Sequence, residues 1–215
     1  MDIITISITI NFELYFFTKM SDSIKTNFIN TNNFSEIGYE VLPNLIPKEL
    51  LEKLRILFVK LMDSNDLSDK VVLENNETKY VTHLEKICSK GDLSCLTLLG
   101  YPPILEIAKQ ICGEDFIMIQ EFAVIKNLGD NESVLWHQDM VNERKGRCFT
   151  MGIYLDDADE DEGALCVIPK SHLFNLPICE IIDFPFIQVP VKAGDVLIHD
   201  MMLAHKSDPL TKNKI

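Results

Sequence analysis

The chain has 215 residues and carries 20 Lys and Arg against 33 Asp and Glu, which gives a formal net charge of −13. This length suits one domain with a substantial core. An apolar share of 47% and a charged share of 25% are ordinary for a globular protein, and they exclude bulk disorder or a bundle of membrane helices. The acidic balance argues against nucleic acid or an anionic membrane as a partner, because both are polyanions.

The first 33 residues lack the features of a targeting or membrane segment. Asp2 stands where a signal peptide would be basic, and Glu13 interrupts the apolar run. Residues 4–10 alternate Ile with Thr or Ser, which is the period of a strand. No run of about 18 uncharged apolar residues is present to span a bilayer. We expect residues 1–33 to form a loosely attached leader that is disordered in part.

The front half of the remaining chain is expected to be mainly helical. Residues 34–43 predict a short strand that ends at a proline. Apolar residues at spacings of three and four predict a helix over residues 47–61, and the polar stretch 63–79 predicts a loop. A second apolar stripe predicts a helix over residues 103–112, with Gly113 as its C-cap.

After Gly113 the pattern changes to short runs rich in β-branched and aromatic residues, separated by turn signals. Several short strands without intervening helices or a repeat period predict an antiparallel sandwich or barrel. Helices packed outside a β-barrel-like core fit this order of elements. The predicted strands cover residues 116–125, 147–155, 164–168, 187–191 and 196–199.

The six cysteines form no C-x-x-C pair and match no zinc-finger spacing. Most of them stand among apolar residues, where a buried free thiol behaves as a small hydrophobe. We therefore expect free thiols rather than disulfides, and from this a reducing, cytoplasmic location. The six are Cys88, Cys95, Cys112, Cys148, Cys166 and Cys179.

The candidate chemistry begins at the tetrapeptide 136–139, Trp-His-Gln-Asp. In an extended segment, residues two apart share a face, so His137 and Asp139 can offer an imidazole and a carboxylate to one ion. Alone this pair is weak, since a surface histidine at a strand end is the alternative. His205, which follows a Gly-Asp turn and two predicted strands, adds the third group. Two histidines and one carboxylate are the facial triad of non-haem iron oxygenases, whereas structural zinc would want four ligands and more sulfur.

Five segments, in the same order, resemble the phytanoyl-CoA dioxygenase family of iron(II)- and 2-oxoglutarate-dependent oxygenases. The resemblance implies a mainly β domain over residues 34–215: a double-stranded β-helix (a jelly-roll, cupin-like core) with flanking α-helices. The set is specific, although each segment alone is not. The segments are residues 34–44, 136–139, 149–158, 163–172 and 194–207.

The resemblance also implies roles for individual residues. His137, Asp139 and His205 match the iron ligands at the catalytic centre, and Ser207 matches a position whose hydroxyl contacts the carboxylate of 2-oxoglutarate. His199 is the competing candidate for the distal ligand.

Four further residues have two interpretations each. His172 closes a Pro-x-Ser-His segment and is expected to be structural, with a role in the site as the alternative. Lys170 stands where the family usually has glycine, so the turn there is expected to differ. His83 and Lys86 lie where relatives place a basic contact to 2-oxoglutarate, and solvated charges are the alternative for both.

The function implied by the resemblance is an Fe(II)- and 2-oxoglutarate-dependent dioxygenase. Such an enzyme uses O2, hydroxylates a C–H of a small-molecule or acyl substrate, and releases succinate and CO2. We expect a monomer. Relatives act on acyl-CoA esters, small osmolytes and natural products, and no motif here separates these substrates, although the charge of −13 disfavours a CoA ester.

One departure from the family creates a rival hypothesis. Relatives carry an arginine about ten residues after the distal histidine, on the next strand, where it pairs with the far carboxylate of 2-oxoglutarate. No arginine follows Arg147, and the last cations are Lys212 and Lys214. We therefore expect a C-terminally truncated jelly roll that lacks its final strand and leaves an edge unpaired. The alternative functions are a catalytically inactive or incomplete metal-binding jelly roll, and a metal-dependent enzyme or sensor that does not use 2-oxoglutarate.

Overall fold

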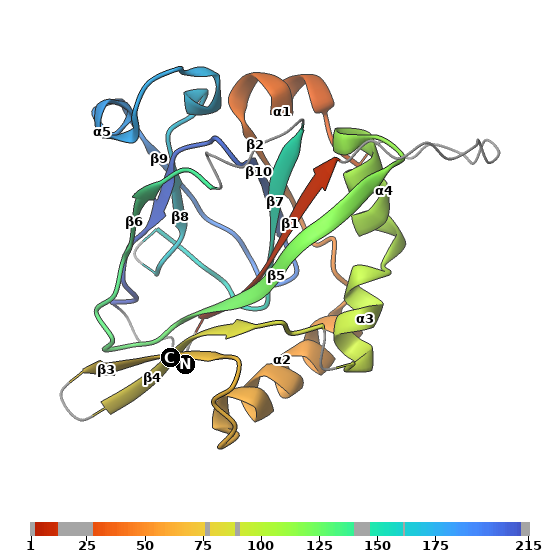
Figure 1. Ribbon diagram of the computed structural model, residues 1–215, viewed down its shortest axis with the longest axis vertical. Coiled ribbons are helices and arrows are strands. Elements are labelled where there is room, and N and C mark those ends of the chain that lie inside the picture. Colours follow the sequence, from red (N-terminus) through yellow and green to blue (C-terminus); the bar gives the residue numbers. More distant parts are fainter. Residues whose placement is uncertain are drawn as a thin grey trace.

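The computed structural model describes residues 3–12, 28–75, 78–88, 91–139, 147–160 and 162–211. Two antiparallel sheets face each other, and helices cover the outer side of the larger one (Figure 1). The strands are β1 Ile3–Phe12, β2 Tyr39–Leu42, β3 Lys70–Asn75, β4 Thr78–Glu85, β5 Phe116–Lys126, β6 Val134–His137, β7 Cys148–Tyr154, β8 Leu165–Val167, β9 Ile187–Val189, β10 Val196–Asp200 and β11 His205–Ser207. The helices are α1 Thr31–Ile37, α2 Lys48–Asp63, α3 Leu93–Leu99, α4 Pro102–Cys112, the 3-10 turn η1 Ser171–Leu173 and α5 Ile178–Ile181.

The large sheet has the strand order β2-β10-β7-β1-β5-β4-β3, and the small sheet has the order β6-β11-β8-β9. Every neighbouring pair of these strands is antiparallel. The mainly β jelly-roll fold with flanking helices is therefore confirmed. Over the described residues the two sheets stay separate and do not close into a barrel.

The first strand corrects the expectation of a loosely attached leader. Residues 3–12 form β1, which pairs with β5 along its whole length and with β7 over Thr5–Asn11. The alternation of Ile with Thr or Ser suits this place, because it gives each face of the sheet one kind of side chain. Between β5 and β7, β1 pairs on both sides, so neither of these two strands has an unpaired edge there, while the expected loss of a final strand stays a prediction. The rest of the expected leader, from residue 13 to residue 27, lies outside the described residues.

The large sheet has two faces of different character. Toward the helices it presents apolar side chains that pack with α2, α3 and α4 in one core: Ile6, Ile8, Ala123, Ile125, Phe149, Met151, Ile153, Val196 and Ile198. The residues between them in the sequence point to the other face and line a cavity between the sheets. This period of two, kept through four neighbouring strands, places the core on one side and the cavity on the other.

The two helices expected from apolar stripes are confirmed as α2 and α4, while the segments before and between them differ from expectation. The strand expected over residues 34–43 is only β2, because α1 begins upstream and ends at Gly38, whose φ is 97°. Asn30 caps α1 by accepting a hydrogen bond from the backbone of Asn33 at 3.2 Å. No described helix is long and apolar enough to cross a membrane.

The loop expected over residues 63–79 is wrong in its second half. Lys70–Asn75 forms β3, which pairs with β4 at the end of the large sheet. Its centre, residues 71–73, is the run Val-Val-Leu, so the alternation of apolar and polar residues that marks a half-buried strand is absent there. α3 was also missed, because only two of its residues, Cys95 and Leu98, are buried.

The cysteines agree with the expectation of free thiols, since all six are unpaired. Four of them are buried and pack as small apolar side chains, Cys88 is partly buried, and Cys179 is exposed. The location inferred from this pattern stays a prediction.

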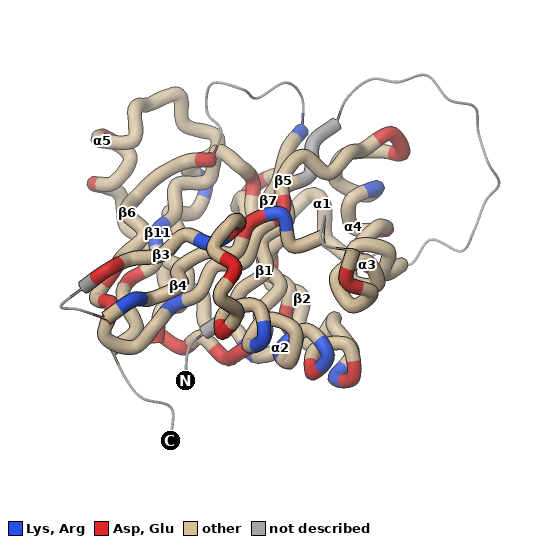
Figure 2. Tube along the Cα trace, turned by 60° about the horizontal axis from the view of Figure 1, so that its bottom comes forward, with Lys and Arg blue, Asp and Glu red and all other residues tan. Residues whose placement is uncertain are grey.

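Charged residues of both signs are interspersed over α2 and the β3–β4 hairpin (Figure 2). Several form local ion pairs, such as Lys53 with Glu49 at 2.8 Å and Lys79 with Glu74 at 2.7 Å. All four side chains are largely exposed, so each pair contributes little to stability.

The position of β1 yields a test. Ile6 is fully buried in the core shared with the helices. Ile6→Ala is expected to lower the free energy of unfolding by about 2–5 kcal/mol, because it leaves a cavity that the sheet cannot collapse. Urea titration measures the change, with Ile117→Ala as the control, since Ile117 on the neighbouring β5 is 38% exposed. Equal, small effects of the two variants would mean that residues 3–12 do not dock in the sheet.

Candidate metal centre

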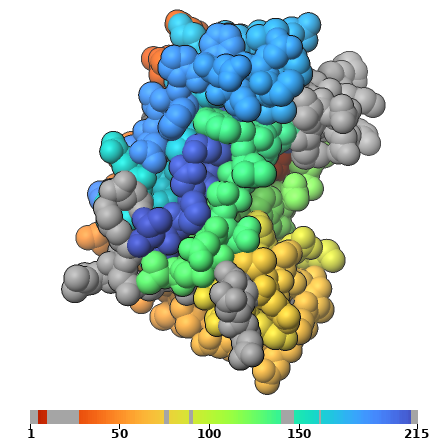
Figure 3. Space-filling view, turned by 90° about the vertical axis from the view of Figure 1, so that its left-hand side faces the viewer, coloured from red at the N-terminus to blue at the C-terminus, as the bar shows by residue number. Residues whose placement is uncertain are grey.

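The two histidines predicted as ligands face each other across a strand pair. β6 pairs with β11, and His137 lies directly opposite His205. Opposite residues of an antiparallel pair project from the same face, and the ring centroids are accordingly 4.1 Å apart. Figure 3 shows β11 (dark blue) lying beside β6 (green). Pairing of the strands therefore joins two residues that are 68 positions apart in the chain.

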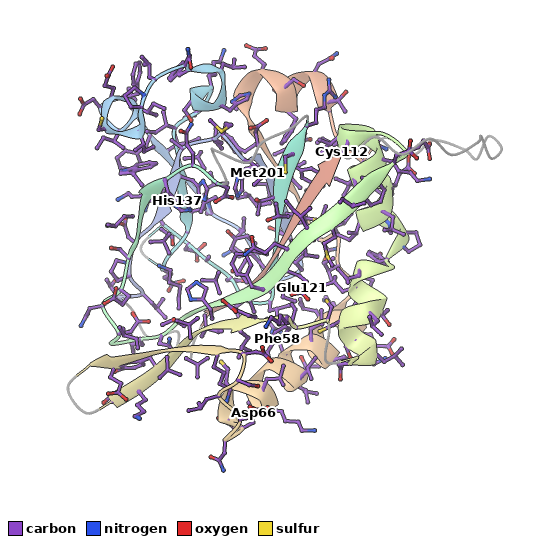
Figure 4. The ribbon with its side chains drawn as sticks, viewed as in Figure 1. Phe58, Asp66, Cys112, Glu121, His137 and Met201 are labelled. Atoms are coloured by element: carbon purple, nitrogen blue, oxygen red, sulfur yellow. The ribbon has the colours of Figure 1, made fainter. Side chains whose placement is uncertain are left out.

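Asp139 reaches the same point because the chain after β6 is held against the turn between β10 and β11. Its backbone N–H donates to the carbonyl of Met201 at 2.8 Å, and the Gln138 amide donates to Met202 at 2.6 Å. Figure 4 labels His137 and Met201 in this part of the molecule. Oδ1 of Asp139 lies 3.4 Å from Nε2 of His137 and 3.8 Å from Nε2 of His205. The three ligand atoms all lie within 4.8 Å of one another, which is compact enough to hold one metal ion.

Hydrogen bonds set which ring nitrogen of each histidine can bind a metal. Nδ1 of His137 lies 2.8 Å from the carbonyl of Leu135, and Nδ1 of His205 lies 2.9 Å from that of Leu203. A carbonyl only accepts, so in the neutral ring the proton sits on Nδ1. Nε2 of each ring then turns a lone pair toward the other two groups, which is how metal-binding histidines are oriented.

The carboxylate is oriented as well. Oδ2 of Asp139 accepts a hydrogen bond from the Thr150 hydroxyl at 3.0 Å, which leaves Oδ1 for the histidines. Burial alone would raise the pKa of Asp139, but the hydrogen bond with His137 and the three nearby imidazoles hold that pKa well below its usual range. Asp139 is therefore an anion at neutral pH, as a metal ligand must be.

The two imidazoles differ in how readily they take a proton. Burial lowers the pKa of His205 to about 3, since the charged ring cannot be hydrated there. Burial also acts against the charged form of His137, but its hydrogen bonds to Asp139 and Leu135 outweigh it and raise the pKa. Of the two rings, His137 takes up a proton more readily, so protons compete with a metal ion mainly there.

The three groups open into a cavity of about 240 Å³ between the sheets. Ser207, the predicted cosubstrate contact, lines it, as does His199, whose ring centroid is 4.4 Å from that of His205. His199 does not belong to the compact ligand cluster, so the geometry favours His205 over it as the distal ligand. Sequence reasoning missed Thr150 and Lys126 in this cavity, because Thr150 had no role of its own within a matched segment and Lys126 stands in none. The alternation of β5 and β7 was the one signal of the face on which they lie.

Of the remaining candidate residues, only one lines the metal cavity. His83 lines the cavity, whereas Lys86 does not and lies 3.5 Å from Asp69 in an ion pair. His172 also lies outside the cavity lining, and its Nε2 is 3.0 Å from the carbonyl of Ser35. The structural interpretation of His172 thus agrees with its contacts.

The turn at Lys170 keeps the conformation that glycine favours. Lys170 has φ 69°, which is left-handed backbone and uncommon for a residue with a Cβ. Its N–H donates to Ile37 at 2.8 Å, and its ammonium lies 2.7 Å from Glu36. Lysine at this position thus takes up left-handed backbone, and the expected difference from the family's turn stays a prediction.

Two facing antiparallel sheets, helices outside the larger one and a two-histidine, one-carboxylate cluster between them define a jelly-roll protein with a candidate mononuclear metal site. The chain belongs to the phytanoyl-CoA dioxygenase (PhyH) family, whose model matches residues 34–214. The resemblance noted in the sequence is thereby confirmed. Among curated protein sequences, none matches the chain.

Solved structures share the fold at low identity. EvdMO1 has a TM-score of 0.77 and 24% identity, and the match covers 86% of this chain but only 46% of EvdMO1. SnoK, a non-heme alpha ketoglutarate dependent carbocyclase from nogalamycin biosynthesis, has a TM-score of 0.75 and 19% identity over 91% of this chain and 83% of its own. EctD from S. alaskensis, solved with 2-oxoglutarate and 5-hydroxyectoine, has a TM-score of 0.74 and 16% identity over 91% and 74%.

Removing a ligand tests the cluster. His137→Ala and His205→Ala are each expected to weaken Fe(II) binding more than roughly 100-fold, since loss of a partner outside the ligand set already reduces metal affinity by about 10–100-fold. Anaerobic competition against a chelator measures the affinity. His172→Ala is the control and is expected to bind as the unaltered chain does. Retention of full affinity by either ligand variant would contradict the assignment.

The buried His205 makes stability depend on pH in the metal-free protein. Its folded pKa of about 3 lies below the ordinary value of a histidine, so unfolding takes up a proton at any pH between the two. The stabilising contribution is complete above pH about 6.5 and is lost as the pH falls from there toward 3, by up to about 1.4 kcal/mol per pH unit. Urea titrations between pH 7.5 and 4.5 with a chelator present are expected to record this slope and its reduction in His205→Asn. An unchanged slope in that variant would count against the buried neutral ring.

Proposed function

We propose that this protein is an Fe(II)- and 2-oxoglutarate-dependent oxygenase that hydroxylates a C–H of a small-molecule or acyl substrate and releases succinate and CO2. The observation that carries the proposal is the cluster of His137, Asp139 and His205, whose ligand atoms lie within 4.8 Å of one another in a cavity.

The donor set fits ferrous iron. Two neutral imidazole nitrogens and one carboxylate oxygen on one side of an ion suit Fe(II) and leave coordination positions for other ligands. His137, Asp139 and His205 would hold the ion, and with 2-oxoglutarate and O2 it supplies the oxidising chemistry when bound.

The other side chains of the cavity bind, orient and exclude water. Thr150 keeps Asp139 turned so that Oδ1 faces the imidazoles. The Ser207 hydroxyl, on the same face of β11 as His205, is a donor for a carboxylate of the cosubstrate. Apolar residues from both sheets line the rest, among them Phe122 and Val124 from the large sheet and Leu165 from the small one, and they keep bulk water from the reacting groups.

Family membership and the fold support the reaction class more than the reaction outcome. SnoK is described as a carbocyclase, and EctD was solved with 2-oxoglutarate. SnoN, a further structure of this fold, is described as an epimerase. Similar folds thus lead to different outcomes, and hydroxylation is the outcome we propose for this chain.

A second hollow, of about 560 Å³, is the proposed site of the primary substrate. It adjoins the metal cavity, because His83 and Phe122 line both. Its other walls are mixed: Met118 and Ile119 are apolar, and among the charged residues the two carboxylates of Glu85 and Glu121 outnumber the one ammonium, that of Lys86. A small molecule bearing hydroxyl or amino groups matches this lining better than an anionic CoA ester does.

The second candidate function is a metal-binding jelly roll without turnover. What favours it is that no arginine stands among the described residues that line the cavity, so the bidentate partner that relatives use for 2-oxoglutarate is not among them. Lys212 and Lys214 lie outside the described residues.

Anaerobic titration separates the two functions. On addition of Fe(II) and then 2-oxoglutarate, the oxygenase is expected to develop the metal-to-ligand charge-transfer absorption of a keto acid bound to ferrous iron. His137→Ala is expected to lose that absorption, since it lacks a ligand. On exposure to O2, succinate should form in the unaltered chain. Iron binding without the absorption band would favour the jelly roll without turnover.

A further inference from the structure

A buried lysine stands in the wall of the metal cavity. Lys126, the last residue of β5, is 8% exposed and lines the cavity with the three candidate ligands. Of the described residues in that lining, it is the only Lys or Arg. Figure 1 shows β5 crossing the large sheet as its longest arrow.

The ammonium of Lys126 is held by neutral groups. Its Nζ donates to the backbone carbonyls of Ser207 and Asp208, each at 3.2 Å, and to that of Glu132 at 3.4 Å. The two contacts at 3.2 Å are at the long end of the ordinary range and the third is beyond it, so a stronger acceptor can displace the Glu132 carbonyl; no described carboxylate oxygen forms an ion pair with Nζ. Burial lowers its pKa, and the more distant carboxylates of Asp130, Asp208 and Glu132 oppose that shift. A buried cation without a direct counter-ion favours an anion in the space beside it.

The position of Nζ fits the length of a keto diacid. Ser207 lies two residues beyond His205 on β11, and residues two apart on a strand are separated by about 6.7 Å. Ser207, whose carbonyl Nζ contacts, thus stands roughly one such repeat along the strand from the ligand His205. The two carboxyl carbons of 2-oxoglutarate are joined by four C–C bonds of about 1.5 Å and so span roughly 5 Å when extended. A metal–oxygen bond adds about 2 Å.

The charges of the cavity also favour a dianionic keto acid. A ferrous ion with the single carboxylate of Asp139 carries a net charge of +1, and Lys126 adds another at the other end of the cavity. A dianionic keto acid neutralises both ends, whereas a monoanion leaves the ammonium without a counter-ion.

We propose that Lys126 binds the far carboxylate of 2-oxoglutarate, the position for which an arginine late in the chain was expected. The inference rests on the proposed function and names the residue that selects a diacid over a shorter keto acid. Lysine acts here as a point charge rather than a bidentate fork, and the neighbouring Ser207 hydroxyl supplies a second donor.

The other basic candidates fit less well. Lys86 lies outside the cavity lining and is paired with Asp69. His83 lines the cavity, but burial holds its pKa below the ordinary value, so the ring is uncharged near neutral pH.

The test compares 2-oxoglutarate with pyruvate, which has the same keto-acid head but no second carboxylate. Both are titrated anaerobically into the Fe(II)-loaded full chain, and binding is followed by absorbance and calorimetry. In the unaltered protein 2-oxoglutarate is expected to bind roughly 10–100-fold tighter than pyruvate, the effect of one charge-assisted hydrogen bond. In Lys126→Gln most of this preference is expected to disappear, because only the Ser207 hydroxyl remains for the far carboxylate, while the affinities for Fe(II) and pyruvate stay unchanged.

Gln keeps N–H donors for the carbonyls of residues 207 and 208, and Lys126→Met, which keeps the apolar stem, is the second variant. Lys206→Gln is the matched control, because Lys206 lies on β11 outside the cavity lining, with its ammonium 2.8 Å from Asp208. It should keep the preference for the diacid. A preference that is absent in the unaltered chain or unchanged in both Lys126 variants would overturn the inference. Failure of the unaltered chain to bind Fe(II), or any keto acid, would instead overturn the proposed function.

Discussion

The insertion of β1 between β5 and β7 is the interaction on which the rest of the structure depends. Without it the large sheet divides into β2-β10-β7 and β5-β4-β3, each with an edge of unpaired backbone groups. On one face β1 adds Ile6 and Ile8 to the core under the helices, and on the other it adds Thr5 and Ser7 to the cavity. A single strand thus links the stability of the domain to the shape of its site.

The two faces of that sheet differ in polarity, because one packs in the core and the other lines the site. The helix side is apolar and supplies the hydrophobic stabilisation. The cavity side buries the polar side chains of Lys126, Thr150 and His199. Apolar side chains of similar volume at these positions would stabilise the fold more. A backbone contact with the β10–β11 turn holds Asp139 near the two histidines, so the fold itself supports the geometry of the ligand set.

Much of the fold follows from local patterns. The apolar stripes of α2 and α4 and the β-rich runs after Gly113 have periods that need no tertiary information. The missed elements are those whose signal is weak or lies outside the segment: α1 begins at an asparagine cap, and β3 is a strand whose centre lacks the alternation of apolar and polar residues. β1 was recognised as strand-like, but its place in the centre of the sheet depends on partners more than 100 residues away.

For the site, the sequence alone determined the type of chemistry, because the residues 137, 139 and 205 stand in family motifs that spacing and residue type reveal. Only the tertiary structure decided which histidine joins the cluster, since the pairing of β6 with β11 puts His205 opposite His137. Only the tertiary structure also places Lys126 in the cavity wall, because this last residue of β5 stands in no sequence motif. The reason is physical: a ligand set is a set of positions in space, and strands from distant parts of the chain must pair before a lone lysine and a motif can share one cavity.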